Sequence, residues 1–465
     1  MAYGFRRYAL EQAYLLPVAP REWVGDGHLV LFLHEVVSEL DLAPIYKEYT
    51  GGRGPKGYHP QLLLEVLLYG YCTGTFSSRK LAARCETDVP MLVLANGQRP
   101  DFRTLATFRK RHLSALQKLF VQVLRLCREA GLVKAGHLSL DGSKYAANAS
   151  KHKAMSYGRI QASEPALVAE IQALLKRATE TDAAEDAEYG PDVRGDELPE
   201  ELRRREGRLA KIREAKARLE ERAEERARER AVARGASDDE IAATMEAAVP
   251  GEKEQSNFTD PDSRIMKTKS GWAQGYNAQI VVEEDSGIIV ACEVSAHAAD
   301  SPRLAPMLAA TETNLAAIGL IGVPDEERTP THFTADAGYC SEKNLALLAA
   351  RGIDAYVATG RERHRRRGVD PHGTPSAQRT PLRAAMRTKL QTPEGRAVYA
   401  RRKCITEPVH GLIKQARGFR QFLLRGLANV QAEFALVALT HNLLKLWRAG
   451  HVGHPGRHAH HVGLA

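Results

Sequence analysis

Apolar side chains recur at helical spacing through the first 135 residues. The strongly apolar run His59–Tyr71 has Pro60 near its start, where proline suits the first turn of a helix. Ser77 and Asp101 are candidate N-caps for the next helices. The pattern from Leu105 to Ala130 predicts one long helix that stops at Gly131. Residues 1–135 are therefore predicted to form an all-helical N-terminal domain.

Strand patterns begin after this region. The alternation in Gly136-His-Leu-Ser-Leu-Asp141 predicts a strand that ends at the aspartate. Residues 276–283 and 288–295 flank Glu-Asp-Ser-Gly and read as a hairpin. His332–Ala335, ending at Asp336, and residues 353–358 are further strands, with helices between them. This order predicts a mixed five-stranded α/β sheet flanked by helices. In strand order 3-2-1-4-5, strands one and four are neighbours.

Residues 160–255 interrupt this pattern. The stretch Glu200–Arg234 is dense in Glu, Arg and Ala with acidic and basic residues four apart, and its apolar stripe is thin. We predict a charged helical hairpin inserted into the domain of residues 136–447, with a solvated spacer helix or a coiled-coil dimer as alternatives. Residues 361–400 are predicted to be rich in loops, followed by helices at 405–417 and 432–447. The tail of residues 448–465, with five histidines, is predicted to be disordered.

Charge and composition narrow the function classes. The net charge is +9, and residues 361–425 hold seventeen Lys and Arg against four Asp and Glu. This block favours a polyanionic partner over a merely solvated loop. Six scattered cysteines without a Cys-x-x-Cys pair, and no run of eighteen apolar residues, argue against a disulfide framework, a structural zinc site and a membrane span. We expect a cytoplasmic protein.

Three carboxylates could form a metal site. Asp141 and Asp336 are expected at the ends of neighbouring strands, and Glu407 is expected to begin a late helix, with Lys414 two turns further on the same face. Clustered carboxylates suit two Mg²⁺ or Mn²⁺ ions in phosphoryl transfer. Each residue alone fits a turn, a helix cap or a surface position equally well. Rival carboxylates are Asp300 and Asp354 for the second position and Glu394 for the third.

These motifs resemble a known family. Leu-Asp141-Gly-Ser-Lys, Ala-Asp336-Ala-Gly-Tyr and Tyr399…Arg402…Glu407…Lys414 resemble bacterial insertion-sequence DDE transposases with a ribonuclease-H-like catalytic domain. Tyr58-His-Pro and Arg103-Thr-Leu-Ala-Thr-Phe-Arg-Lys-Arg-His are similar to the helical N-terminal domain of that family. The resemblance implies metal binding by the two aspartates and Glu407.

The resemblance also implies contacts with DNA ends by Tyr399, Arg402 and Lys414. Four residues separate Arg402 from Glu407 where the family usually has three, so Arg401 and Lys403 are alternatives. His410 is expected to be a packing residue. In the N-terminal domain, Arg109 and Arg111 are among the basic residues that a helix-turn-helix DNA reader would use, with a helical dimerisation domain as the alternative.

The expected function is therefore a DNA transposase. It would bind the terminal inverted repeats of its element, cut there with water as nucleophile, and join the freed 3′-hydroxyl to target DNA. Its partners would be double-stranded DNA and a second copy of the chain, or more copies, in a synaptic assembly. The alternatives are a catalytically inactive or recruited DNA-binding protein on the same fold, and a ribonuclease-H-like nuclease without strand transfer.

Overall fold

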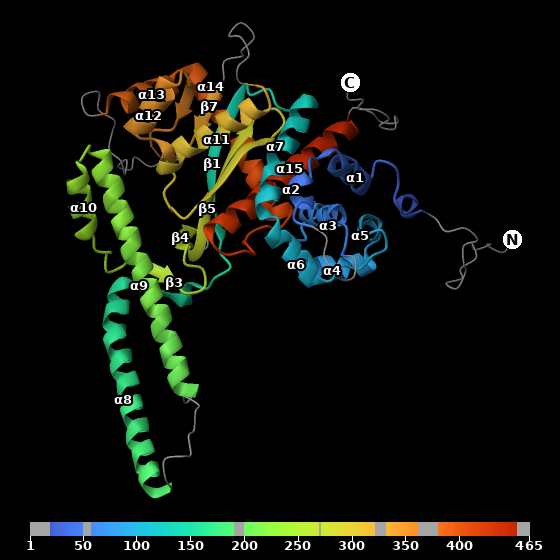
Figure 1. Ribbon diagram of the computed structural model, residues 1–465. Helices are drawn as coiled ribbons and strands as arrows, with labels where there is room; N and C mark the ends of the chain where they lie inside the picture. Colours follow the sequence, from blue (N-terminus) through green and yellow to red (C-terminus); the bar gives the residue numbers. More distant parts are fainter. Residues whose placement is uncertain are drawn as a thin grey trace, which may run out of the picture.

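A computed structural model describes residues 19–49, 57–189, 200–268, 271–320, 332–360 and 380–452 (Figure 1). The predicted tail beyond Val452 and the basic residues 361–379 lie outside this set. A helical region, a mixed sheet with its covering helices, and a long helical arm make up the described part. None of the helices in these ranges is both long enough and apolar enough to cross a bilayer.

Every secondary-structure element among the described residues of the N-terminal region is a helix. Proline at the first position starts α3, and Asp101 caps α6 by accepting hydrogen bonds from the backbone N–H groups of Arg103 and Thr104. The helices are η1 (Pro20–Trp23), α1 (Leu29–Glu39), α2 (Ala43–Tyr46), α3 (Pro60–Cys72), α4 (Ser78–Thr87), α5 (Val89–Leu94), α6 (Phe102–Arg111) and α7 (Leu113–Glu129).

The long helix predicted over residues 105–130 is instead two helices. His112 separates α6 from α7 with backbone angles of −101° and 17°, which do not continue an α-helix. Its imidazole is buried, stacks on Tyr49 with ring centres 5.5 Å apart, and meets the Tyr49 hydroxyl at 3.2 Å. Periodicity does not reveal the break because apolar positions continue on both sides of it.

A mixed sheet follows the helical region along the chain. Its strands are β1 (His137–Ala146), β4 (Arg264–Thr268), β5 (Gly271–Glu283), β6 (Ile289–Ser295), β7 (His332–Ala335) and β8 (Asp354–Val357). The order β6-β5-β1-β7-β8 follows from the pairings, with β1 parallel to β7 and β7 parallel to β8, while β5 is antiparallel to β1 and β6. The first and fourth strands of the predicted order are therefore neighbours.

Among the described residues the sheet has six strands rather than the five predicted. The extra strand, β4, pairs with Gly271–Gly275 of β5, whereas β6 pairs with Asn277–Val282. Because Gly275 pairs with β1 on one side and with β4 on the other, β4 and β6 share one edge of β5, one after the other. The mixed α/β sheet is confirmed, and it is compatible with a DDE catalytic domain.

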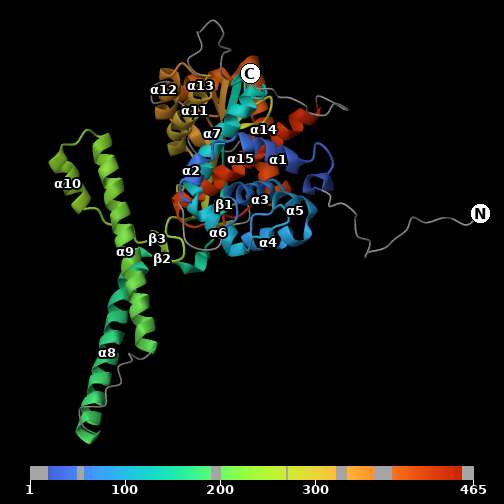
Figure 2. The ribbon, with the colours of Figure 1, turned by 45° about the vertical axis from the view of Figure 1, so that its right-hand side comes forward.

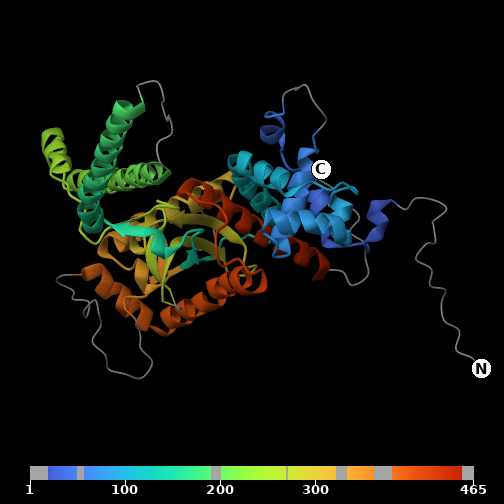
Figure 3. The ribbon, with the colours of Figure 1, turned by 90° about the horizontal axis from the view of Figure 1, so that it is seen from below.

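Helices cover both faces and one edge of this sheet. α11 (Leu304–Ala317) packs on β5 and β6, and α14 (Pro393–Gly411) crosses β1, β5, β7 and β8. α12 (Glu342–Ala350) and α13 (Pro381–Gln391) pack on β8. Figure 3 shows α13 and α14, in orange, along one side of the sheet. Residues 380–400 are thus helical rather than loop-rich, since Pro381 and Pro393 each start a helix and Thr392 caps α14.

The final helix, α15 (Leu427–Val452), links the sheet to the helical region by packing on β6, α3 and α7. Asn442 donates to the Ile289 carbonyl at 2.8 Å and accepts from its N–H at 2.9 Å. Gln431 accepts from the N–H of Val294 and donates to the Cys292 carbonyl. These side chains satisfy the open edge of β6, which would otherwise invite pairing with another chain.

The charged insertion forms an arm of two long helices, as predicted. α8 (Tyr157–Tyr189) and α9 (Glu200–Ala233) project from the rest of the chain in both Figure 1 and Figure 2. The short strands β2 (Ala154–Ser156) and β3 (Gln255–Asn257) pair at its base, and α10 (Asp238–Glu246) follows α9. The thin apolar stripe of α9 includes Leu202, Ile212 and Leu219; Ile212 and Leu219 pack against residues of α8, whereas the side chain of Leu202 lies outside the described ones.

Candidate active site

The structure places Asp141 beside the end of β7. Register pairs Leu140 with Ala335, the last residue of β7, and the next residues along the two parallel strands are Asp141 and Asp336. Asp336 ends its strand as predicted, and its carboxylate accepts a hydrogen bond from the Gly338 N–H at 2.8 Å. Asp141 lies in the middle of β1 rather than at its end, because β1 continues to Ala146 by pairing with β5.

Burial and mutual repulsion disfavour the charged forms of the two aspartates. The Asp141 side chain is 19% exposed, and its burial raises its pKa to about 6. Arg402 opposes this shift, whereas Asp336 and Asp300 add to it. Burial also raises the pKa of Asp336, against the hydrogen bond from Gly338 and with a further contribution from Asp300. Carboxyls that repel one another in a half-buried position are favourable ligands for a cation.

Helix α14 supplies the cation that faces Asp141. Nη1 of Arg402 lies 3.7 Å from Oδ1 of Asp141, and the hydroxyl of Thr406, one turn further on, lies 3.5 Å from Oδ2. The guanidinium carbon of Arg402 is 5.9 Å from the ring centre of Tyr399. The Arg402 side chain is 12% exposed, yet its Nε and Nη1 have no hydrogen-bond acceptor among the described residues. The site therefore holds buried donors suited to a bound anion.

Glu407 does not begin a helix, contrary to the prediction. It lies inside α14, four residues before the end at Gly411, next to Thr406 and exposed. The prediction was wrong because it took Pro408 as a sign of the first turn of a helix, whereas Pro408 lies inside α14. A π-helical segment, η6 (Leu412–Ala416), follows α14.

A π-helix has more residues per turn than an α-helix, so the prediction that Glu407 and Lys414 lie two turns apart on the same helix face does not hold. Lys414 instead reaches β1, where Nζ donates to the hydroxyl of Ser143 and to the carbonyl of Lys144 at 2.8 Å. It also lies 4.1 Å from the ring centre of Tyr145. His410, one turn before Lys414, is buried with its Nδ1 3.3 Å from the Tyr145 hydroxyl, as expected of a packing residue.

Asp300 contributes a fourth carboxylate beside β1, the strand that contains Asp141. Its Oδ1 accepts from Asn277 at 2.7 Å, from Gln279 at 3.0 Å and from Lys144 at 3.3 Å. Gly142 makes room for this group, since a Cβ there would stand 2.4 Å from Gln279 Nε2 and 2.9 Å from Asp300 Oδ1. The sequence offered Asp300 only as a rival for Asp336, whereas the structure contains both near Asp141.

The other two rival carboxylates lie away from the aspartates. Asp354 begins β8 and is paired with His332, at the opposite end of these parallel strands from Asp336. Its carboxylate binds Lys389 and His332. Glu394 is in the first turn of α14 and is exposed. Burial raises the pKa of the Tyr356 hydroxyl of β8, Asp354 adds to the shift, and Glu394 makes a smaller contribution in the same direction.

The donor chemistry of this site suits a hard divalent cation. Carboxylate oxygens from Asp141, Asp336 and Asp300 are gathered at one end of β7, which is the ligand type that Mg²⁺ prefers. In the described ranges, however, no three His, Cys, Asp or Glu side chains are arranged as they stand to hold a metal ion. The structure contains the adjacent Asp141 and Asp336, Asp300 near them, and an exposed Glu407 on α14.

The cations predicted to bind DNA have different surroundings. Arg401 forms an ion pair with Glu284, and Lys403 is exposed, so Arg402 is the cation of this group that faces Asp141. Arg111 is half exposed, with its Nε 3.1 Å from Glu48.

Arg109 contradicts the prediction of a DNA contact. It is buried and donates to the Tyr71 hydroxyl and to the Phe76 carbonyl, both at 3.0 Å. Near it, Glu433 of α15 accepts from the N–H groups of Leu423 and Leu424 at 3.0 Å and from Tyr71 at 3.4 Å. Arg109 thus joins the helical region to α15 and is not available at the surface.

Comparison with family models gives two matches. Residues 247–443 match a model described as a transposase DDE domain, which includes Asp336 and Glu407 but not Asp141. Residues 19–111 match a model described as a transposase domain (DUF772). Searches of curated proteins and of solved structures gave no match. The two matched segments occur in the order that the motifs implied, and the chain belongs to the DDE transposases of insertion sequences.

Proposed function

We propose that this chain binds the terminal inverted repeats of its element, cuts the DNA there, and transfers the freed strand to target DNA. The observation that carries the proposal is the side-by-side placement of Asp141 and Asp336 by the parallel pairing of β1 and β7, with Arg402 against them. The family match supports a DNA substrate and polynucleotidyl transfer. We assign the third carboxylate to Glu407.

DDE transposases generally use divalent metal ions, and Asp141, Asp336 and Glu407 would hold them here. The ions would activate the attacking oxygen and stabilise the leaving one. Glu407 is exposed one residue from Thr406, whose hydroxyl lies 3.5 Å from Asp141, which makes it our choice for the third ligand. A bound divalent cation would favour the ionised forms of Asp141 and Asp336, which burial and neighbouring carboxylates disfavour in the free protein.

The chain's own cations would position the phosphate. The Nε and Nη1 of Arg402 have no hydrogen-bond acceptor among the described residues, although Nη1 pairs with Asp141 at 3.7 Å, and they would donate to the oxygens of the scissile phosphodiester. Tyr399, against Arg402, and Lys414, over Tyr145, would contact the DNA on either side. Exposed Lys403 and Arg111 would bind backbone phosphates, so affinity should fall steeply with added salt. Synapsis of two ends would require a dimer or a larger assembly.

Cleavage of a duplex that carries the ends of the chain's own element tests this proposal. With Mg²⁺ or Mn²⁺, the protein should nick the end, and chelation by EDTA should stop the reaction. Asp141→Asn, Asp336→Asn and Glu407→Gln should each lower cleavage by at least about a thousandfold and leave DNA binding intact. Glu394→Gln is the matched control, because it is an exposed glutamate of the same helix at the far end from Asp141.

The activities of the three carboxylate variants test each proposed ligand separately. Full activity of Asp141→Asn or Asp336→Asn would refute the proposed site. Full activity of Glu407→Gln alone would move the third ligand to Asp300. Joining of end DNA to a plasmid, and its loss when the end carries a 3′-deoxynucleotide, distinguishes a transposase from a nuclease that only cuts.

A further inference from the structure

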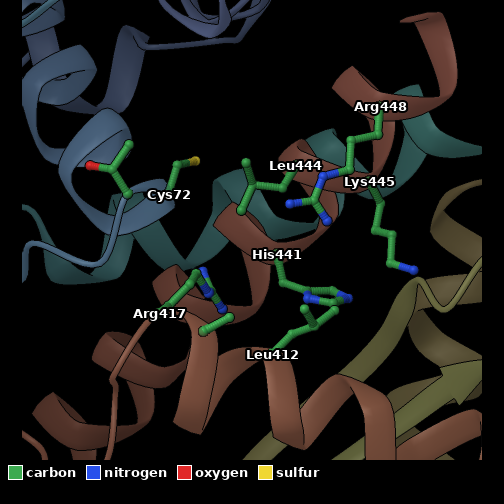
Figure 4. A pocket seen from close by; sticks show the side chains of 9 residues that line it. Cys72, Leu412, Arg417, His441, Leu444, Lys445 and Arg448 are labelled. Atoms are coloured by element: carbon green, nitrogen blue, oxygen red, sulfur yellow. The ribbon is translucent and has the colours of Figure 1, made fainter. Parts of the chain in front are cut away.

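A separate cavity lies where the helical region meets the C-terminal helix. Its volume is about 190 Å³, and it is lined by the end of α3, by η6 and by one face of α15. Figure 4 shows Arg417, His441, Lys445 and Arg448 around it, with the guanidinium of Arg448 extending toward His441. Leu412 and Ala416 of η6 line it as well, whereas Lys414 of the same segment contacts β1. The cavity is therefore distinct from the carboxylate site.

The lining of this cavity carries an unbalanced positive charge. Arg417, Lys445 and Arg448 contribute three cations, and no aspartate or glutamate is among the lining residues. Burial lowers the pKa of Arg417 to about 10, and the positive charge of Arg448 contributes in the same direction. Burial and Arg448 likewise lower the pKa of Lys445. Clustered cations of this kind repel one another unless an anion lies between them.

Arg417 is the buried member of the cluster. It is 7% exposed, and its Nη1 and Nη2 donate to the Thr440 hydroxyl at 2.8 Å and to the Val437 carbonyl at 3.0 Å. Its Nε has no acceptor among the described residues. A buried guanidinium that meets only neutral acceptors, with one donor left over, is costly unless a negative charge compensates it.

His441 does not add to the charge. Its burial lowers its pKa to about 3, and its Nε2–H donates to the Gly287 carbonyl at 2.9 Å, so the ring is neutral at physiological pH. The nearby thiol of Cys72 is buried, and its sulfur lies 3.7 Å from the Thr440 carbonyl. The charge that a ligand would meet is therefore set by two arginines and one lysine.

We propose that this cavity binds a phosphate group, held by Arg417, Lys445 and Arg448. A multiply charged oxyanion matches three cations, and the planar donor fork of arginine suits tetrahedral phosphate oxygens. The volume admits a phosphate or pyrophosphate and is below the range of typical drug-sized ligand pockets. The phosphate comes either from a free anion or from the backbone of bound DNA, because both present the same oxygens.

Pyrophosphate is the probe for the first experiment. Titration calorimetry on the full chain without DNA, at an ionic strength held constant with chloride, should show saturable binding at one site. Pyrophosphate should also raise the thermal midpoint, since a ligand of the folded state stabilises it. Arg448→Gln and Lys445→Gln remove the more accessible cations and should each weaken binding about tenfold. Lys343→Gln, an exposed lysine of α12, is the matched control and should change nothing.

Competition then identifies the source of the phosphate. Displacement of pyrophosphate by duplex DNA, with weaker DNA binding in Arg448→Gln, would assign the cavity to the DNA backbone. Independent binding of both would assign it to a free anion. No saturable binding of pyrophosphate together with unchanged DNA affinity of Arg448→Gln, or pyrophosphate binding that survives both substitutions, would overturn the proposal. None of these readouts depends on strand cleavage, so the result is separate from that of the proposed transposase activity.

Discussion

Replacement of Asp141 by asparagine should make the folded chain more stable while it removes the proposed activity. Burial of Asp141, with the added repulsion of Asp336 and Asp300, raises its pKa from 3.8 to about 6 in spite of Arg402. A difference of about two in pKa corresponds to about 3 kcal/mol of unfavourable free energy for the charged carboxylate. Asparagine removes this charge, although Arg402 then loses its carboxylate neighbour. We therefore expect a gain of about 1–3 kcal/mol at pH 8.

The gain in stability should depend on pH, and the raised pKa of Asp141 fixes the direction of that dependence. Because the folded pKa of Asp141 is raised, the folded chain takes up the proton first as the pH falls through 6, and the unfolded chain follows only near 3.8. The destabilisation by Asp141 is full above pH 6 and disappears toward pH 4. The stability difference between Asp141→Asn and the natural chain should therefore be largest at pH 8 and should shrink on acidification.

Thermal unfolding with EDTA present measures this difference. For a chain of this length, about 3 kcal/mol corresponds to roughly 3 °C in the midpoint. Asp354→Asn is the control of opposite sign: burial alone would raise the pKa of Asp354, but its hydrogen bonds with Lys389 and His332 lower it. That variant should lose stability at pH 8. A midpoint of Asp141→Asn equal to or below that of the natural chain at pH 8, or a gap that does not shrink between pH 8 and pH 4.5, would refute the reasoning.

Three further predictions concern Gly142, Glu433 and Asp300. Gly142→Ala should lower cleavage and cost about 1–3 kcal/mol, because its Cβ would displace Gln279 and Asp300, whereas Gly136→Ala, with open space around it, should be neutral in both assays. Glu433→Gln should cost about 3 kcal/mol or more in urea unfolding, because it leaves Arg109 buried without a counter-charge, and a loss below 1 kcal/mol would contradict this role. Asp300→Asn should shift the acid limb of the cleavage rate to lower pH, because Asp300 raises the pKa of both Asp141 and Asp336, and an unchanged limb would exclude that coupling.

Local signals in the sequence correctly predicted that a strand leads into each of the two aspartates, Asp141 and Asp336. The hairpin of β5 and β6 and the strand before Asp336 agree with the predicted elements, because each is set by alternation or a turn within a few residues. The family resemblance is confirmed by the two model matches. The helical arm follows from its charge pattern in the same way.

Errors arose where long-range packing overrides a local signal. Asp141 looked like a strand end because Gly142 follows it, but the glycine makes room for Asp300 from a segment far along the chain. Glu407 looked like a helix start because of Pro408, but α14 runs through that proline against four strands. Arg109 looked like a DNA contact within a basic stretch, but Tyr71 and Glu433 hold it in the interior. Only the fold shows which member of a cluster of charges is buried.

Two buried arginines connect the proposed DNA site with the proposed phosphate cavity. Arg402, on α14, and Arg417, directly after η6, both have guanidinium donors without acceptors among the described residues, and both are nearly enclosed. The π-helical segment between them contacts β1 through Lys414 and lines the cavity through Leu412 and Ala416. In the free protein these donors lower stability, and bound phosphate oxygens would satisfy them. The free energy of unfolding should therefore rise when either site is filled.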